Sequence, residues 1–507
     1  MKAIFIFIFF FCFSFSASAK QDELIIAIEE WPACFNPVLQ SGTTVFSVGA
    51  QIFAGLTRLD EQGNVVPYLA EKWDLSDDRK TYTFHLKENA FFHDNSKITA
   101  DDVVYSINFS KENHPFHPFL EHIRHVKPLD ENTVEITLKY PMDVFPSFLI
   151  PILVPVLPRW HYDYPSLNYP LIGSGPFKII TFEENSSVCL ERFDKFFLDE
   201  KPVLKYITFK VFFDFYEIFY ALTCDDIDLF LFYPCSGIAS YIDAKTIERF
   251  SVFPIDYIYP YMVITYNMRK SFFQDIRVRR ALSLALDKEK LASFFQSEFV
   301  KPVSGAMPFT NPYYTPIRRE FDIEKANELL DEAGYARDNS GKRFSISMDY
   351  LAYSYMSDII HWVQSEWSKN LGIELILRDR NAFVNIGQKN LLVDFDLFFD
   401  ELLLWHDPLI GMYRLYAEDN INKNKLWTNI GAYHNQEIEI LFKKAAVETD
   451  EERKKALYAE IQQALSDDYA SLWLISNMYY VIAKKNVHGL EKLPHKTMSP
   501  MLDVAVK

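Results

Sequence analysis

Short strand patterns alternate with amphipathic helical patterns along the whole chain, which restricts it to folds that mix the two kinds of element. Strands are expected where apolar runs are bounded by turn residues, at 24–28, 81–86, 133–138, 177–180, 188–191, 206–211 and 373–377. Helices are expected where apolar residues recur at helical spacing, at 99–108, 275–295, 322–333, 358–371, 437–446 and 450–465. No fixed-period repeat or low-complexity linker interrupts them. The sequence therefore predicts an α/β protein whose chain crosses back and forth between lobes.

Several predicted helices carry recognisable terminal residues. Thr99 precedes two carboxylates, Asp101 and Asp102, as expected for a capped helix start with acidic groups in its first turn. Gly334 and Gly372 follow two predicted helix ends, where glycine accepts the left-handed conformation. These signals predict where the helices begin and end.

Residues 1–19 have the pattern of a secretory signal peptide. A basic start at Lys2 is followed by an apolar run at 3–13 and by the small residues Ala17 and Ala19 at a cleavage site. The run is too short to cross a bilayer core of about 30 Å. We therefore expect export to the periplasm, with Lys20 as the mature start and a soluble mature protein. An uncleaved membrane anchor is the alternative.

The charge balance excludes some classes of partner. The chain has 52 Lys+Arg and 69 Asp+Glu, a formal net charge of −17. Nucleic acids and anionic lipid surfaces are recognised by a surplus of basic residues, so neither is an expected partner. The acidic balance is compatible with cationic ligands, although surface acidity mostly serves solubility.

The cysteines and histidines are candidates for disulfide bridges and metal sites. After export the chain keeps Cys34, Cys189, Cys224 and Cys235, whose spacings match no zinc template. A bridge between Cys224 and Cys235 closes the shortest loop and is the expected pairing, with buried free thiols as the alternative. Four histidines fall close together, at His114, His117, His122 and His125. Prolines 115 and 118 prevent one helix from presenting all four, so we expect surface histidines, no metal and no cofactor.

Six stretches of sequence stand out in order along the chain. They are Phe92-His93-Asp94 with Tyr105-Ser106, Gly173-Ser174-Gly175-Pro176, the segment 278–287, the segment 325–335, Trp405-His406-Asp407-Pro408, and the segment 433–441. Asn95 stands in a turn where a left-handed conformation is expected, which asparagine tolerates. The glycines at 173 and 175 precede a strand pattern and not a helix, which argues against a dinucleotide-phosphate loop.

These stretches resemble the motifs of the family 5 extracellular solute-binding proteins, the oligopeptide- and dipeptide-binding type that serves ABC importers. The resemblance implies a two-lobe periplasmic-binding-protein fold with an extra domain on lobe I, of the type II or cluster C kind. It places lobe I at 20–48, 172–264 and 479–507, the extra domain at 49–171, and lobe II at 265–478. The two crossings between lobes are expected near 261–267 and 480–487. The resemblance also implies a tight inter-lobe connection at Gly173 and Gly175.

The same resemblance implies that a ligand lies between the lobes. The contacting segments are the loop after the first strand and the stretch leading to the Asp-Pro pair. The candidate ligand-binding residues are Glu30, Trp31, Phe35, Glu401, Trp405 and Asp407. Core packing is the alternative for Trp31 and Trp405.

One position departs from the family pattern. Peptide-binding members usually carry a carboxylate three positions before the Asp-Pro, to hold the α-amine, and this chain has Leu404 there. Asp400, Glu401 and Asp407 flank that position and are candidates to substitute. The departure leaves open whether the ligand is a peptide or a related small solute.

No catalytic constellation appears in the sequence. There is no Gly-x-Ser-x-Gly elbow and no His-Glu-x-x-His pair. The expected function is that of a monomeric periplasmic substrate-binding protein that hands its ligand to an ABC permease in the inner membrane, not that of an enzyme. The alternatives are an exported enzyme and a periplasmic peptide chaperone using the same cleft. Stoichiometric ligand binding without turnover would exclude an enzyme.

Overall fold

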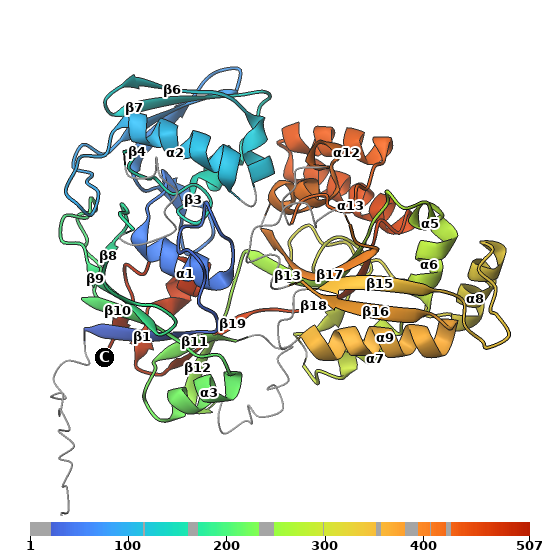
Figure 1. Ribbon diagram of the computed structural model, residues 1–507. Coiled ribbons are helices and arrows are strands. Elements are labelled where there is room, and N and C mark those ends of the chain that lie inside the picture. Colours follow the sequence, from blue (N-terminus) through green and yellow to red (C-terminus); the bar gives the residue numbers. More distant parts are fainter. Residues whose placement is uncertain are drawn as a thin grey trace, which may run out of the picture.

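The computed structural model describes residues 22–114, 117–160, 171–232, 248–297, 299–350, 356–380, 394–405, 407–421 and 427–507. Two halves lie side by side, each built around its own sheet (Figure 1). The strand order is β12-β19-β11-β1-β10-β9-β8 in the first sheet and β14-β18-β13-β17-β15-β16 in the second. Helices pack around both sheets. The predicted α/β class is therefore confirmed.

The first sheet collects strands from three distant parts of the chain. They are β1 (Glu23–Ile28), β8 (Phe177–Glu183), β9 (Ser187–Arg192), β10 (Tyr206–Val211), β11 (Leu229–Phe232), β12 (Phe250–Pro254) and β19 (Tyr480–Lys484). Strand β1 is parallel to both neighbours, β10 and β11. Its nearly continuous apolar sequence fits a central strand that is covered on both faces. Helix α3 (Phe215–Thr223) packs on this sheet through Ile218 and Leu222.

The second sheet is similarly assembled. Its strands are β13 (Ile258–Tyr266), β14 (Lys301–Pro302), β15 (Ser345–Tyr350), β16 (Glu374–Asp379), β17 (Leu397–Trp405) and β18 (Ser471–Ser476). The longer helices of this half are α6 (Ile276–Leu284), α7 (Lys288–Ser293), α8 (Ile323–Glu332), α9 (Ser357–Leu371), α12 (Gln436–Val447) and α13 (Glu451–Asp467). Shorter turns are α5 (Ser271–Gln274), η6 (Leu409–Tyr413), α11 (Arg414–Tyr416) and η7 (Glu418–Asn420).

A smaller unit lies above the first sheet in Figure 1. Its four-stranded sheet has the order β4-β5-β7-β6. The strands are β4 (Ala70–Leu75), β5 (Thr81–Leu86), β6 (Ile123–Asp130) and β7 (Thr133–Leu138), and helix α2 (Ala100–Asn113) covers them. Helix α1 (Thr43–Ile52) and the pair β2 (Thr57–Leu59) and β3 (Val65–Pro67) connect this unit to the first sheet. The remaining elements are η1 (His117–His122), η2 (Phe145–Leu149), β20 (Val487–His488), η8 (Leu490–Lys492), η9 (Lys496–Met498) and β21 (Ala505–Val506).

The chain passes between the two large sheets twice. The first crossing, residues 255–257, joins β12 to β13, and the second, residues 477–479, joins β18 to β19. Strand β13 pairs with β17 over its whole length, so it belongs entirely to the second sheet. The expected lobe boundary at 264–265 would therefore leave seven of the nine residues of β13 in lobe I, because a buried apolar strand gives no local sign of which sheet it joins.

One predicted helix is two helices. The segment 275–295 was expected to be continuous, but the chain breaks between α6 and α7. The Asp287 carboxylate accepts a hydrogen bond of 3.0 Å from the backbone N–H of Lys290 and so caps the second helix. An aspartate that bonds the backbone in this way competes with helix continuation.

The other predicted elements agree with the structure at their cores. Strands β5 and β7 have the predicted bounds, and α2 begins with a capping box between Thr99 and Asp102. Asn95 has φ 71°, as its place in the turn required. Gly372 ends α9 with φ 70°, and a Cβ there would lie 2.3 Å from the carbonyl oxygen of Gly341.

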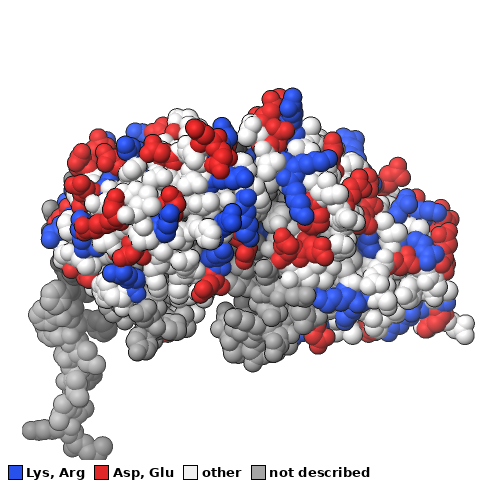
Figure 2. Space-filling view, turned by 90° about the horizontal axis from the view of Figure 1, so that it is seen from above, with Lys and Arg blue, Asp and Glu red and all other residues white. Residues whose placement is uncertain are grey.

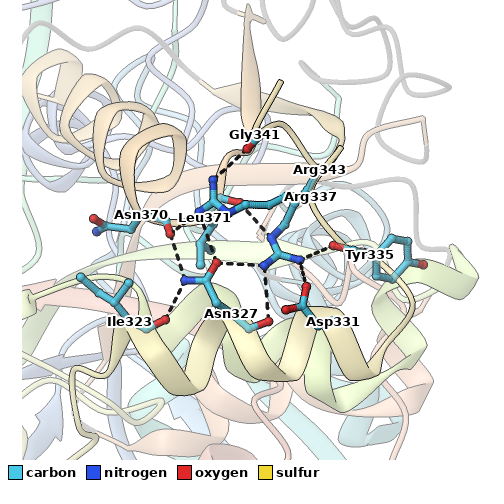
Figure 3. Close-up of polar contacts among 9 residues, drawn as sticks. All are labelled: Ile323, Asn327, Asp331, Tyr335, Arg337, Gly341, Arg343, Asn370 and Leu371. Carbon is cyan, nitrogen blue, oxygen red and sulfur yellow. Dashed lines mark hydrogen bonds and ion pairs between the residues drawn. The ribbon is translucent and has the colours of Figure 1, made fainter. Parts of the chain in front are cut away.

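The segment 325–335, one of the six sequence motifs, serves packing inside the second half. It forms most of α8, whose end is held by the buried guanidinium of Arg343 (Figure 3). That group pairs with Asp331 and donates to the carbonyl of Leu371 at 3.1 Å and to Asn327 Oδ1 at 2.9 Å. Arg337 donates to the carbonyl of Asn370 at 2.8 Å. The two arginines thus satisfy carbonyl groups at the end of α9, which have no partner within their own helix, and Arg343 joins them to side chains of α8.

Candidate ligand-binding site

A pocket of about 500 Å³ lies at one edge of the first sheet. The loop after β1 supplies most of its wall, from Glu29 to Phe35 and at Gln40. The turn between β8 and β9 adds Glu184 and Asn185, and the remaining wall is formed by Leu171, Phe182 and Phe213. Because β1 and β10 are parallel, their carboxyl ends meet at this edge. This is the position where open α/β sheets bind ligands.

The same edge of the sheet faces the second half of the molecule. Phe232 at the end of β11 is paired with Tyr480 at the start of β19, and Tyr480 is also paired with Pro254 at the end of β12. Both crossings therefore leave the first sheet at the edge where β11 and its parallel neighbour β1 end. A pocket at this edge lies on the side from which the second half approaches.

Three aromatic rings form one wall of the pocket. The ring centroids of Trp31 and Phe35 are 5.3 Å apart, and those of Trp31 and Phe182 are 5.2 Å apart, both in edge-to-face geometry. Phe35 is buried, whereas Trp31 is only partly buried. Edge-to-face packing holds the indole in place and leaves part of it accessible from the pocket.

The polar part of the wall is acidic. Glu29, Glu30 and Glu184 line the pocket, and none of the described residues lining it is Lys, Arg or His. Burial, and then the neighbouring Glu30, raises the pKa of Glu29 to about 8. Burial also raises the pKa of Glu30. The pocket therefore disfavours its own negative charge unless a cation enters.

Glu401 lies in β17 and binds the second crossing. Its carboxylate accepts a hydrogen bond of 3.0 Å from Asn477 Nδ2 and another from the hydroxyl of Tyr479. Glu401 is almost fully buried. It therefore ties the second sheet to the segment that leads back to the first.

Trp405 ends β17 and is packed between the two halves. Its ring lies 6.1 Å from that of Phe46 and 5.6 Å from that of His495, measured between centroids. Both neighbours belong to segments expected in lobe I. Only 3% of Trp405 is exposed. In this arrangement its indole is an inter-lobe contact.

Asp407 is engaged by a residue of its own half. Its Oδ2 lies 2.5 Å from Lys454 Nζ, and its Oδ1 accepts a 2.9 Å hydrogen bond from the backbone N–H of Leu409. Both side chains of the ion pair are largely buried. A ligand cation would have to displace Lys454 to reach this carboxylate.

The position expected to hold a carboxylate is filled by an apolar side chain. Leu404 is fully buried and packs against Gly411, where a Cβ would lie 1.7 Å from a Leu404 methyl carbon. Asp400, a candidate substitute, accepts a 2.8 Å hydrogen bond from Trp427 Nε1, and burial raises its pKa to about 7. Its carboxylate is thus occupied within the second half.

The structure therefore divides the candidate residues into two sets. Glu30, Trp31 and Phe35 share the pocket on the first sheet, whereas Glu401, Trp405 and Asp407 lie outside its wall. A direct ligand contact for the second set stays a prediction. The wall residues that were not predicted include Glu29, Phe182, Glu184 and Phe213. Adjacent glutamates directly after a strand were the available signal for Glu29, but the other three reach the pocket through the sheet order.

Two of the sequence motifs contact each other away from the pocket. The backbone N–H of His93 donates to the carbonyl of Gly173 at 2.9 Å, and its Nε2 lies 3.1 Å from the carbonyl oxygen of Gly175. A Cβ at Gly173 would lie 2.0 Å from the carbonyl oxygen of Ile52. The glycines thus permit close packing where the extra domain meets the first lobe, and not the connection between lobes that was expected.

Two of the four clustered histidines, His114 and His122, have separate partners. His114 is buried with Nε2 3.4 Å from the carbonyl of Ile152, and His122 bonds the hydroxyl of Tyr140. Within the described ranges, no group of three His, Cys, Asp or Glu side chains is placed to hold a metal ion. Cys34, Cys189 and Cys224 form no disulfide with one another, and Cys235 lies outside the described residues, as does the segment 1–19. The expected bridge therefore stays a prediction.

In the part of the chain described, no helix is long and apolar enough to cross a membrane.

Comparison with known proteins gives one family. The sequence model described as "Bacterial extracellular solute-binding proteins, family 5 Middle" matches residues 64–423. The chain is 26% identical to the oligopeptide-binding protein AppA of Bacillus subtilis, over 94% of this chain and 90% of that protein.

Solved structures agree with the fold. The periplasmic binding protein DppA of Helicobacter pylori, in complex with the peptide STSA, matches with a TM-score of 0.82 at 20% identity, over 96% of this chain and 98% of that one. NikZ of Campylobacter jejuni, in complex with Ni(L-His), matches with a TM-score of 0.78 at 23% identity, over 96% and 99%. The expected two-lobe periplasmic-binding-protein fold with an extra domain is confirmed.

Proposed function

The chain belongs to the bacterial extracellular solute-binding proteins of family 5, and from this premise we propose that it binds a peptide or a related small solute between its lobes and delivers it to an ABC permease in the inner membrane. We also propose that it is exported by the segment 1–19, works in the periplasm as a monomer, and binds without turnover. The domain boundaries proposed for this function are those given above, with β13 moved to lobe II.

One observation carries the proposal. The pocket of about 500 Å³ lies at the edge of the first sheet from which both crossings leave. A solute held there meets the second half when the lobes close. Closure about two short crossings is a hinge motion, and a ligand that prefers the closed form shifts the equilibrium toward it.

The contacts across the lobes fit such a motion. Trp405 packs against Phe46 and His495, and Glu401 holds Asn477 and Tyr479 at the second crossing. Both sets of contacts join elements that would separate or rotate on opening. We propose that these residues set the closed arrangement, while Glu30, Trp31 and Phe35 contact the ligand.

Two kinds of observation bear on the class of solute: what the relatives bind, and which residues this chain has at the site. AppA of Bacillus subtilis is named as an oligopeptide-binding protein, which supports a peptide. NikZ of Campylobacter jejuni carries Ni(L-His), so the same fold also holds a small solute that is not a peptide. Leu404 removes the carboxylate expected for an α-amine in lobe II.

The test is a ligand screen with a readout of stoichiometry and turnover. The mature protein is titrated by calorimetry with di-, tri- and pentapeptide mixtures and with amino-acid–metal complexes, and the mixtures are analysed by mass spectrometry afterwards. Saturable binding of one solute per chain, with the solute recovered intact, is expected. Consumption of a solute would support an enzyme, and binding of unfolded chains but of no small solute would support a chaperone.

A further inference from the structure

We propose that the pocket after β1 receives an organic cation, an ammonium or guanidinium group, held between Glu29, Glu30 and the indole of Trp31. The inference rests on the proposed function, because it names the chemical group of the solute that lobe I recognises. It also places the anionic end of the site in lobe I, although the candidates that the sequence offered to hold an α-amine were Asp400, Glu401 and Asp407 in lobe II.

The charged side chains in the pocket wall are all acidic among the described residues. Glu29, Glu30 and Glu184 line the pocket, and the described wall offers no Lys, Arg or His side chain to balance them. Over the face seen in Figure 2, by contrast, Lys and Arg side chains are interspersed with Asp and Glu. An anionic group would be repelled here, and a cation would be attracted at short range.

One buried carboxylate oxygen of the pocket wall has no hydrogen-bond partner among the described residues. Oε1 of Glu29 is shielded from solvent and accepts no hydrogen bond from any described residue. Polar atoms in such positions are normally hydrogen-bonded, so the oxygen marks where a donor is missing. A cationic donor satisfies both the bond and the charge, whereas an apolar group would leave the oxygen unpaired.

Aromatic side chains form part of the pocket wall beside the carboxylates. Trp31 is held edge-to-face by Phe35 and Phe182 and remains partly exposed in the pocket. Tryptophan is the best aromatic partner for an ammonium or guanidinium group. Carboxylates and an aromatic face together recognise an organic cation better than a hydrated Ca²⁺ or Mg²⁺ ion, which prefers oxygen ligands alone.

Electrostatics inside the pocket agree with this assignment. Burial keeps the pKa of Glu29 near 8, so the empty pocket holds a proton at neutral pH. A bound cation would replace that proton. The volume exceeds that of an ammonium group alone, so the cation is expected to be one end of a larger solute.

The test compares matched cationic and neutral probes. The tripeptide alanyl-lysyl-alanine is titrated against its norleucine analogue, each with a free and an acetylated N-terminus, and agmatine is titrated as a non-peptide cation. The wild-type protein should bind at least one cationic probe at least 10-fold more tightly than its neutral partner. Loss of affinity on acetylation would identify the α-ammonium as the source, and loss on replacement of lysine would identify the side chain.

Three variants test whether the tighter binding of the cationic probe arises in this pocket. Glu29→Gln and Glu30→Gln keep side-chain volume and remove charge, and Glu71→Gln on the exposed face of β4 is the control. In each pocket variant, the affinity for the cationic probe should exceed that for the neutral probe by less than 3-fold. The affinity for the neutral probe should stay as in the wild type, and the melting temperature should not fall. The control should behave as wild type.

The outcomes separate this inference from the proposed function. Tight binding of neutral probes without a cationic preference, or a preference that survives both pocket variants, overturns the inference and leaves the binding function intact. A protein that binds no solute of either set or of the wider screen contradicts both.

Discussion

The indole of Trp405 packs edge-on against the imidazole of His495, with ring centroids 5.6 Å apart. Trp405 ends a strand of the second sheet, and His495 lies in the chain's return to the first lobe. The two lobes are therefore in contact through a buried aromatic pair. This contact has a consequence for stability that a ligand contact would not have.

Trp405→Ala is expected to destabilise the protein even without ligand. Only 3% of the residue is exposed, so the substitution removes buried contacts and should lower the free energy of unfolding by about 3 kcal/mol or more. Urea unfolding measures the change. Trp160→Ala is the control, because Trp160 is 50% exposed and should cost much less. Unchanged stability together with lost binding would instead make Trp405 a ligand contact.

Tyr479→Phe should act on closure and not on ligand choice. The substitution removes the hydroxyl that donates to the buried carboxylate of Glu401 at the second crossing. A hydrogen bond to a charged group contributes about 1.5–3 kcal/mol, so the open–closed equilibrium should change. The affinities for all ligands should change by one common factor, as measured by calorimetry. A changed ratio between cationic and neutral ligands would contradict a hinge role.

The ion pair of Asp407 and Lys454 should behave as a buried structural pair. Asp407→Asn or Lys454→Met leaves one group unpaired in the interior and should cost about 3 kcal/mol. The double variant Asp407→Leu/Lys454→Met should recover most of that loss in urea unfolding. Lys97→Met in the exposed pair with Glu131 is the control and should cost less than about 1 kcal/mol. Full stability of Asp407→Asn with lost binding would assign Asp407 to the ligand.

The proton held by Glu29 predicts two opposite pH dependences. The folded pKa is raised from 4.5 to about 8, so the folded state binds this proton more tightly than the unfolded state. The contribution to stability is complete below about pH 4.5 and is lost as the pH rises toward 8, so the ligand-free protein should become less stable over that range. Thermal unfolding at several pH values measures this.

Cation binding should show the reverse trend. The cation needs ionised Glu29, so affinity should rise with pH up to about 8, with proton release detected in buffers of different ionisation enthalpy. Glu30, Cys34 and Glu184 are the other titratable groups in the described wall. Glu29→Gln should remove both trends. Proton uptake on binding would contradict the assignment.

Local sequence patterns predicted the strands and helix ends well where interactions between residues close in sequence determine the structure. The alternation at 81–86 and 133–138 reproduces β5 and β7, and the Thr99 and Gly372 signals reproduce helix ends. The break before Asp287 was missed because the apolar stripe continues across it. Strand β18, buried at every position, has no alternation from which it could be identified.

The site was predictable only on the side that is local in sequence. Glu30 and Trp31 follow β1 directly, so the family pattern located them. The partners that occupy the lobe II candidates come from far along the chain: Lys454 is 47 positions from Asp407, and Asn477 is 76 from Glu401. Contacts at such separation follow from the sheet order and the helix packing, which no local pattern contains.

Native mass spectrometry tests the central claim, binding of a solute between closing lobes, most directly. The protein is isolated from the periplasm without unfolding and measured before and after mild denaturation. The account predicts one small organic solute per chain, carrying an ammonium or guanidinium group and released intact on denaturation. A chain that carries no solute and that takes up none when offered the screened peptides and amines would contradict it.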